Sequence, residues 1–127
     1  MSQFEPFAIA LRLSGVTLSQ RELDNALVQL TSRYEPEDAD GSFYAQVDIA
    51  PRNAVRTILE LADRSGPTLA RLLDERRIGK AVLDLAFDYP TQGEAMSARI
   101  PAHVATAIAG YGIDIEFSVY LTDVEED

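Results

Sequence analysis

The sequence predicts an α+β fold, in which a mainly antiparallel sheet of about five strands carries its helices on one face, a ferredoxin-like variant. The clearest sign is residues 112–121, GIDIEFSVYL, where apolar and polar side chains alternate almost without a break. Successive side chains of a strand point to opposite faces, so one face is expected in a core and the other in water. The residues expected in that core are Ile113, Ile115, Phe117, Val119 and Leu121. Every long strand is similarly half-polar, which argues against a parallel sheet covered on both faces.

The first strand is expected over residues 7–13, where apolar side chains alternate with small or polar ones, and Gly15 breaks it. Ser19 and Glu22 then have the spacing of a capping box, in which each side chain bonds to the backbone of the other residue. The helix that they open has apolar residues at i, i+3, i+4 and i+7, namely Leu23, Ala26, Leu27 and Leu30. We expect this helix to end near Arg33.

The middle of the chain is expected to form a loop, a strand and two helical pieces. Residues 34–42 have a loop composition, and residues 43–49 alternate as a second strand. Residues 53–63 predict a helix, which residues 65–67, Ser-Gly-Pro, interrupt. Pro67 suits the first turn of a further helix, because its missing amide needs no partner there. That second piece is expected to stop at Gly79.

The last third is expected to begin with a strand over residues 80–89. A turn at residues 90–94 leads to a short strand at residues 96–100, so these two strands form a hairpin. Pro101 opens a third helix that Gly112 closes. The final strand and an acidic tail at residues 123–127 complete one α+β domain over residues 1–127, in the order β-α-β-α-α-β-β-α-β.

Composition narrows the classes of function. The chain has 127 residues, no cysteine and a net charge of −10, so thiol catalysis and disulfides are excluded and a nucleic-acid partner is not expected. No signal peptide is expected at the N-terminus, and no apolar run approaches the roughly 20 residues that span a bilayer. These features favour a cytoplasmic protein that does not bind a membrane. The acidic balance is compatible with a basic protein partner, or with acidic loops that only keep the protein in solution.

The order of elements resembles a known family. Gly15 and Leu18 form a G-x-x-L step before the capped helix, a leucine-rich helical segment follows, and residues 109–121 read AGYGIDIEFSVYL. This arrangement resembles the bacterial domain of unknown function 4279 family over nearly the whole chain. The resemblance implies an α+β fold and an intracellular bacterial setting, with no established activity or catalytic residues. Some members of that family resemble immunity proteins encoded near toxins.

Two local features fall short of a chemical site. Asp38, Asp40 and Gly41 resemble the middle of a calcium loop, but the positions that need the first and last carboxylates are Pro36 and Val47. His103 lies in the first turn of the third helix without an accompanying nucleophile motif, so we expect an exposed helical residue. Neither a metal nor a cofactor is predicted.

One polar surface is the candidate site. If the strands pair as expected, their polar faces form a common surface that also contains Ala8, Ala10, Val82 and Ser118. Its candidate interaction residues are Arg12, Tyr44, Gln46, Asp48, Asp84, Asp88, Asp114, Glu116 and Tyr120. Tyrosine and arginine are enriched in protein interfaces. A solvated face ranks first among the interpretations, a protein interface second and an active site third.

The preferred hypothesis is therefore a non-catalytic binding domain, which acts as a homodimer or by binding a basic protein, in the manner of an immunity protein. The acidic balance and the missing catalytic machinery favour it. The rival hypothesis is a small-molecule or metal-dependent enzyme that uses the carboxylates of the polar face, Asp48, Asp84, Asp88, Asp114 and Glu116.

Overall fold

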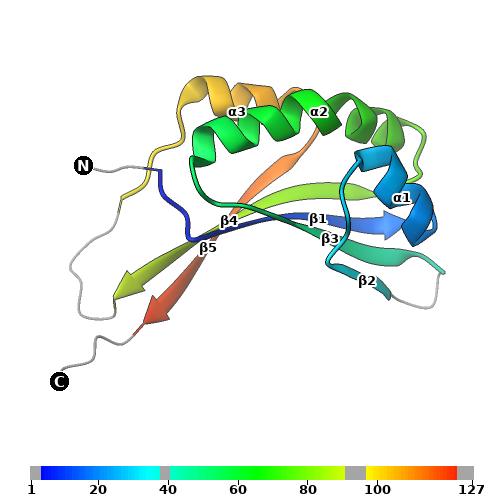
Figure 1. Ribbon diagram of the computed structural model, residues 1–127, viewed down its shortest axis with the longest axis horizontal. Coiled ribbons are helices and arrows are strands. Elements are labelled where there is room, and N and C mark those ends of the chain that lie inside the picture. Colours follow the sequence, from blue (N-terminus) through cyan, green and yellow to red (C-terminus); the bar gives the residue numbers. More distant parts are fainter. Residues whose placement is uncertain (1–3, 38–40, 91–96, 123–127) are drawn as a thin grey trace.

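A computed structural model describes residues 4–37, 41–90 and 97–122, and it confirms the α+β class. The strands form one five-stranded sheet in the order β2-β3-β1-β4-β5, and three helices lie over one of its faces (Figure 1). In chain order the elements are β1 (Ala8–Val16), α1 (Gln20–Leu27), β2 (Arg33–Pro36), β3 (Phe43–Ile49), α2 (Ala54–Asp74), β4 (Lys80–Pro90), α3 (Ala102–Ala109) and β5 (Asp114–Thr122). We call the helix-free face of the sheet the open face.

The sheet is mostly antiparallel, as expected. β3 pairs antiparallel with β2 and with β1, and β1 pairs antiparallel with β4. β4 and β5 are parallel, because the chain returns between them through α3, the crossover that parallel neighbours require. The finer ferredoxin-like description is compatible with this arrangement and stays a prediction.

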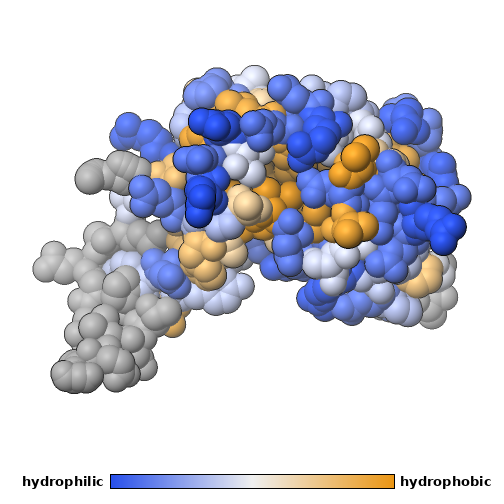
Figure 2. Space-filling view, viewed as in Figure 1, coloured by the Kyte–Doolittle hydropathy of each residue, from blue (hydrophilic) through white to orange (hydrophobic). Residues whose placement is uncertain are grey.

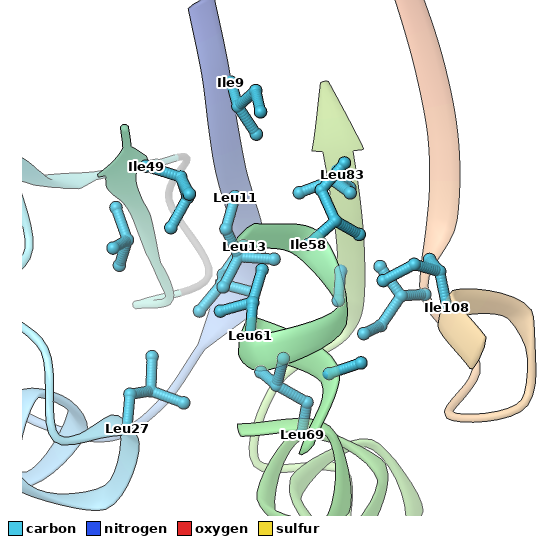
Figure 3. Close-up of a cluster of buried hydrophobic side chains, with 14 of the residues drawn as sticks. Ile9, Leu11, Leu13, Leu27, Ile49, Ile58, Leu61, Leu69, Leu83 and Ile108 are labelled. Carbon is cyan, nitrogen blue, oxygen red and sulfur yellow. The ribbon is translucent and has the colours of Figure 1, made fainter. Parts of the chain in front are cut away.

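The core lies between the sheet and the helices. Figure 3 shows side chains of β1 and β4 meeting those of α2, with Leu27 and Ile108 reaching in from α1 and α3. One continuous cluster of buried apolar residues joins all three helices to the sheet. Its largest fully buried side chains include Leu11, Leu13, Leu27, Ile58, Leu69, Leu83, Leu85 and Ile108. Truncating such a leucine to alanine typically costs about 2–5 kcal/mol.

Helix α1 begins as expected and ends early. The Ser19 hydroxyl accepts from the Glu22 amide at 3.1 Å, and the Glu22 carboxylate accepts from the Ser19 amide at 2.9 Å. The helix stops at Leu27, because Val28 takes a left-handed conformation with φ 56°. Leu30 is therefore 81% exposed, and its expected place in the buried stripe is wrong. The Asp24 carboxylate accepts from the Thr31 amide and fixes this early turn.

Strand β2 replaces part of the expected loop. The ring of Tyr34 stacks on Phe43 with centroids 4.7 Å apart, and its hydroxyl donates to the Leu18 carbonyl. β2 is only four residues long and contains Pro36, a combination that gives little strand signal. Proline is tolerated because β2 is an edge strand, where the missing amide need not pair.

Three other expectations about regular structure are wrong. Helix α2 runs through Pro67 without a break, since its buried stripe continues on both sides of the proline. Residues 97–100 form no strand, so no hairpin with β4 is seen there. Gly15 lies within β1, at φ 63° and an irregular register, and does not end the strand. Met96, the expected turn at residues 91–94, Asp38, Asp40 and the acidic tail lie outside the described residues.

Candidate interaction surface

The strand register places all nine candidate residues on the open face. Arg12 lies directly opposite Gln46 of β3 and Val82 of β4, and Ala10 lies opposite Asp48 and Asp84. Residues directly opposite each other project to the same side of a sheet. In the parallel pair, the matched open-face positions are Val82 with Asp114, Asp84 with Glu116, Ala86 with Ser118 and Asp88 with Tyr120.

Asp84 joins the neighbouring strands of the open face through its side chain. Its carboxylate is 2.7 Å from the Arg12 guanidinium and accepts from the Ser118 hydroxyl at 2.7 Å. Asp84 is 4% exposed although no helix covers this side of the sheet, whereas the Arg12 side chain is 39% exposed. A buried carboxylate is stabilised by such pairing and by charge-assisted hydrogen bonds. Asp84 therefore serves the structure of the face and is not free for acid–base chemistry.

Polar contacts also order the β2–β3 side. Tyr44 donates to Gln46 at 2.7 Å, and the Gln46 amide donates to Asp48 at 2.9 Å. Arg33 donates to Glu35 at 2.8 Å and lies over the ring of Tyr44 at 5.4 Å. The hydrogen bond with Glu35, followed by the charge of Glu35, raises the pKa of the Arg33 guanidinium above its ordinary value. Arg33 and Glu35 thus neutralise each other.

Acidic side chains predominate among the charged residues of the open face that form no ion pair with another described residue. The exposed carboxylates that lie outside these ion pairs are Asp48, Asp88, Asp114 and Glu116. Lys80, at the first position of β4, is exposed on the same face and has the opposite charge. Because the carboxylates outnumber it, the open face has a negative potential that concentrates towards β4 and β5.

The outer half of β5 departs from the expected core. Phe117, Val119 and Leu121 project to the helix side, yet they are 51%, 53% and 66% exposed. The helices cover only the start of β5, where Ile113 is buried, and β4 and β5 continue past the helical layer (Figure 1). The strand prediction is confirmed, but the burial of its second half is wrong. Alternation fixes which way a side chain points and leaves open how far the covering layer extends.

An apolar recess lies beside these exposed residues. Its volume is about 400 Å³, and its lining residues are Phe87, Tyr89, Ala98, Phe117 and Val119. Figure 2 shows apolar surface between the helices and the ends of β4 and β5. On the other side of the same strands, Tyr120 meets Phe7 edge-on with ring centroids 5.6 Å apart. Sequence reasoning missed the recess, because it assigned Phe117 and Val119 to the interior.

A second cavity, of about 740 Å³, lies at the start of α2 and has a mixed lining. Its charged lining residues are Arg52, Arg56 and Glu5, and most of the others are apolar.

Metal-ligating side chains do not cluster within residues 4–37, 41–90 and 97–122. In these ranges no three His, Cys, Asp or Glu side chains are placed to hold a metal ion. His103 is exposed on α3, as expected. No helix of the described parts combines the length and apolarity needed to cross a membrane.

Comparisons with known proteins add no relative. A scan against protein-family models, a search of curated proteins and a search of solved structures each returned no match. The resemblance to the domain of unknown function 4279 family stays a prediction that rests on the order of elements and their glycines.

Proposed function

We propose that this domain is a non-catalytic binding protein whose open face docks a basic protein partner. The observation that carries the proposal is the charge of that face, where Arg12 and Arg33 are each bound to a carboxylate. Asp88, Asp114 and Glu116 stay exposed on adjacent strands. Complementary charge steers a partner to such a surface and fixes its orientation.

The shape of the face supports close approach. The central strands present small side chains there, because Ala8 lies opposite Ala86 and Ala10 lies between Asp48 and Asp84. A partner can therefore reach the sheet without displacing a bulky layer. Tyr44 and Tyr120 add aromatic surface at the two sides of this floor, and tyrosine is favoured in interfaces. A cytoplasmic, immunity-like role in a bacterium belongs to the same proposal.

An enzyme is the weaker alternative for these carboxylates. A carboxylate that acts as an acid or base generally has its proton affinity tuned by burial or by a close charged neighbour. Asp84 has such surroundings, but both of its oxygens are engaged by Arg12 and Ser118. Asp48, Asp88 and Glu116 are exposed to water.

Charge reversal tests the proposal. One variant carries Asp88→Lys, Asp114→Lys and Glu116→Lys on the open face. Its matched control carries Glu60→Lys, Asp63→Lys and Asp74→Lys on the exposed side of α2, so both variants have the same net charge. Binding of lysine-rich polypeptide is measured by calorimetry at several salt concentrations. We expect the open-face variant to lose about tenfold in affinity and the α2 variant to lose less than about threefold.

Equal losses in the two variants would mean that only net charge matters, and would overturn a docking site on the open face. Absence of binding to the wild-type protein would contradict a basic partner altogether. Urea unfolding of both variants checks that the fold has been kept.

Self-association is a second candidate, which the exposed ring pair of Phe7 and Tyr120 favours. Two copies would then share a two-fold interface, in which each presents the same patch. The net charge of −10 on each copy opposes this contact. Sedimentation of the wild type and of Tyr120→Glu decides, since a dimer that dissociates in the variant supports self-association. A monomeric wild type at high concentration contradicts it.

A further inference from the structure

Strand β5 forms an unpaired edge of the sheet. In the described residues it pairs with β4 alone, so one side of its backbone carries amide and carbonyl groups without strand partners. The run from residue 117 to residue 122, FSVYLT, contains no charge and no proline. Proteins usually protect long edges with charges, prolines or bulges, because such edges recruit other strands. The β5 edge lacks these devices over its outer half.

Both sides of this edge offer side-chain contacts. Towards the helix side, Phe117 and Val119 border the apolar recess. Towards the open face, Glu116 is exposed and Asp88 lies directly opposite Tyr120. A strand laid along β5 would therefore meet apolar groups with every second side chain and acidic or aromatic groups with the others.

We propose that the basic partner adds a strand to the β5 edge, and that this strand alternates apolar and basic residues. The inference rests on the proposed function and names its mode of recognition. Backbone hydrogen bonds along β5 supply affinity, and side chains at alternate positions supply specificity, as in other cases of strand addition to an exposed edge.

The register follows from cross-strand geometry. A side chain directly opposite another lies with its Cβ about 4.5–5.5 Å away. A lysine or arginine opposite Glu116 therefore meets a carboxylate, and an apolar side chain opposite Phe117 or Val119 extends the lining of the recess.

Charge favours a foreign strand over a second copy. In a β5–β5 pair, two molecules that each have a net charge of −10, and that each expose Asp114 and Glu116 on β5, would be brought together. Like charges brought together in this way destabilise the pair, whereas a basic strand gains from the same carboxylates. The occupant we commit to is therefore a basic, extended segment of another protein.

A peptide series tests this directly. The probe is a capped peptide of about eight residues that alternates lysine and valine, a typical strand length. Its controls are the same residues in two blocks, an alternating glutamate–valine peptide, and the alternating peptide N-methylated along one edge. We expect the block peptide to bind about tenfold more weakly, and the glutamate and N-methylated peptides to show no binding. Hydrogen exchange of amides in residues 114–122 should slow when the alternating peptide binds.

Variants locate the contact. Glu116→Lys and Phe117→Ser should each weaken binding of the alternating peptide about tenfold, because they alter opposite sides of the same edge. Val119→Ser is a second apolar variant, should Phe117→Ser fail to fold. Glu60→Lys is the matched control, since it reverses an exposed acid on α2, outside the open face and the proposed edge. It should change affinity by less than about threefold.

The outcomes separate this inference from the proposed function. Equal binding of block and alternating peptides, with no loss in Phe117→Ser or Val119→Ser, overturns strand addition and leaves docking on the open face. Binding of lysine-rich polypeptide without binding of the alternating peptide likewise overturns strand addition and leaves docking on the open face. Failure of both probes overturns both proposals. A wild-type dimer that Val119→Lys dissociates assigns the edge to a second copy and overturns the foreign strand.

Discussion

At the scale of single residues, the ion pair of Arg12 and Asp84 defines the open face. Asp84 is the one charged residue buried in the part of the chain that the structure describes. It lies on β4 between β1 and β5, and it takes one bond from each neighbouring strand. This arrangement holds three strands in register beneath the proposed docking surface, so the pair is expected to matter more than exposed ion pairs do.

Arg12→Ala should lower the free energy of unfolding by about 2–3 kcal/mol, since it leaves a buried carboxylate with Ser118 as its remaining partner. The matched control is Arg71→Ala. Arg71 and Glu75 form an ion pair at 3.7 Å, and both side chains are exposed. That change should cost less than about 0.5 kcal/mol. Urea unfolding compares the two, and equal small losses would contradict a structural role for Asp84.

Gly66 shows a second residue-scale effect, where α2 approaches α3. A Cβ added at Gly66 would lie 2.4 Å from the ring of Tyr111. Gly66→Ala should therefore destabilise the wild type by about 1–3 kcal/mol through overpacking. In a Tyr111→Ala background the same change should stabilise by about 0.5–1 kcal/mol, because alanine is the better helix residue. Thermal unfolding of the four proteins in this cycle measures the change of sign.

Tyr34 should make stability depend on alkaline pH. Burial, and then the charge of Glu22, raise the pKa of the Tyr34 phenol above its ordinary value of about 10. A raised pKa in the folded state means that the contribution is complete below about pH 10 and is lost as pH rises through the folded value. The stability difference between wild type and Tyr34→Phe should therefore shrink above that pH. Urea unfolding across this range measures it, and a constant difference would contradict the effect.

At the scale of elements, the capping box controls where α1 begins. Ser19→Ala should cost about 1 kcal/mol, because the Glu22 amide loses its acceptor. Arg21→Ala is the control, since Arg21 is exposed in the same helical turn and alanine favours helix. It should change stability by less than about 0.5 kcal/mol. Circular dichroism during urea unfolding reports both, and a silent Ser19→Ala would contradict the cap.

The elements that sequence predicted well are those whose residues alone fix them. Alternation located β1, β3, β4 and β5, and the capping box located the start of α1. The register then followed closely enough to gather all nine candidate residues on the open face. These features depend on local periodicity, which a single sequence records directly.

The elements that sequence missed depend on distant packing. Residues 65–67 read as a break, but Gly66 is the close-approach point for Tyr111 and the helix continues. β2 is stabilised by its pairing with β3 and by the stacking of Tyr34 on Phe43. The sequence of its four residues does not predict these contacts. The exposure of Phe117 depends on the length of the helical layer above it. None of these quantities is encoded within a short window of sequence.

At the scale of the whole molecule, acidic, basic and apolar side chains occupy different parts of the surface. Acidic residues gather on the open face, basic residues border the cavity at the start of α2, and apolar side chains surface beside β5. A net charge of −10 alone would attract a basic protein to any side. Because the acidic residues concentrate on the open face, a basic protein would be attracted to that face in a preferred orientation.

Chemical-shift mapping of the backbone amides, during titration with the alternating lysine–valine peptide, tests this account most directly. If the peptide docks on the open face and along its edge, the largest changes follow β5 and the adjoining open-face positions of β4 and β1. Amides near Arg52 and Arg56 should stay unchanged, because these residues lie at the start of α2, outside the open face and the β5 edge. Changes that centre on α2 and α3, or that scatter over every acidic region, would contradict a docking site on the open face.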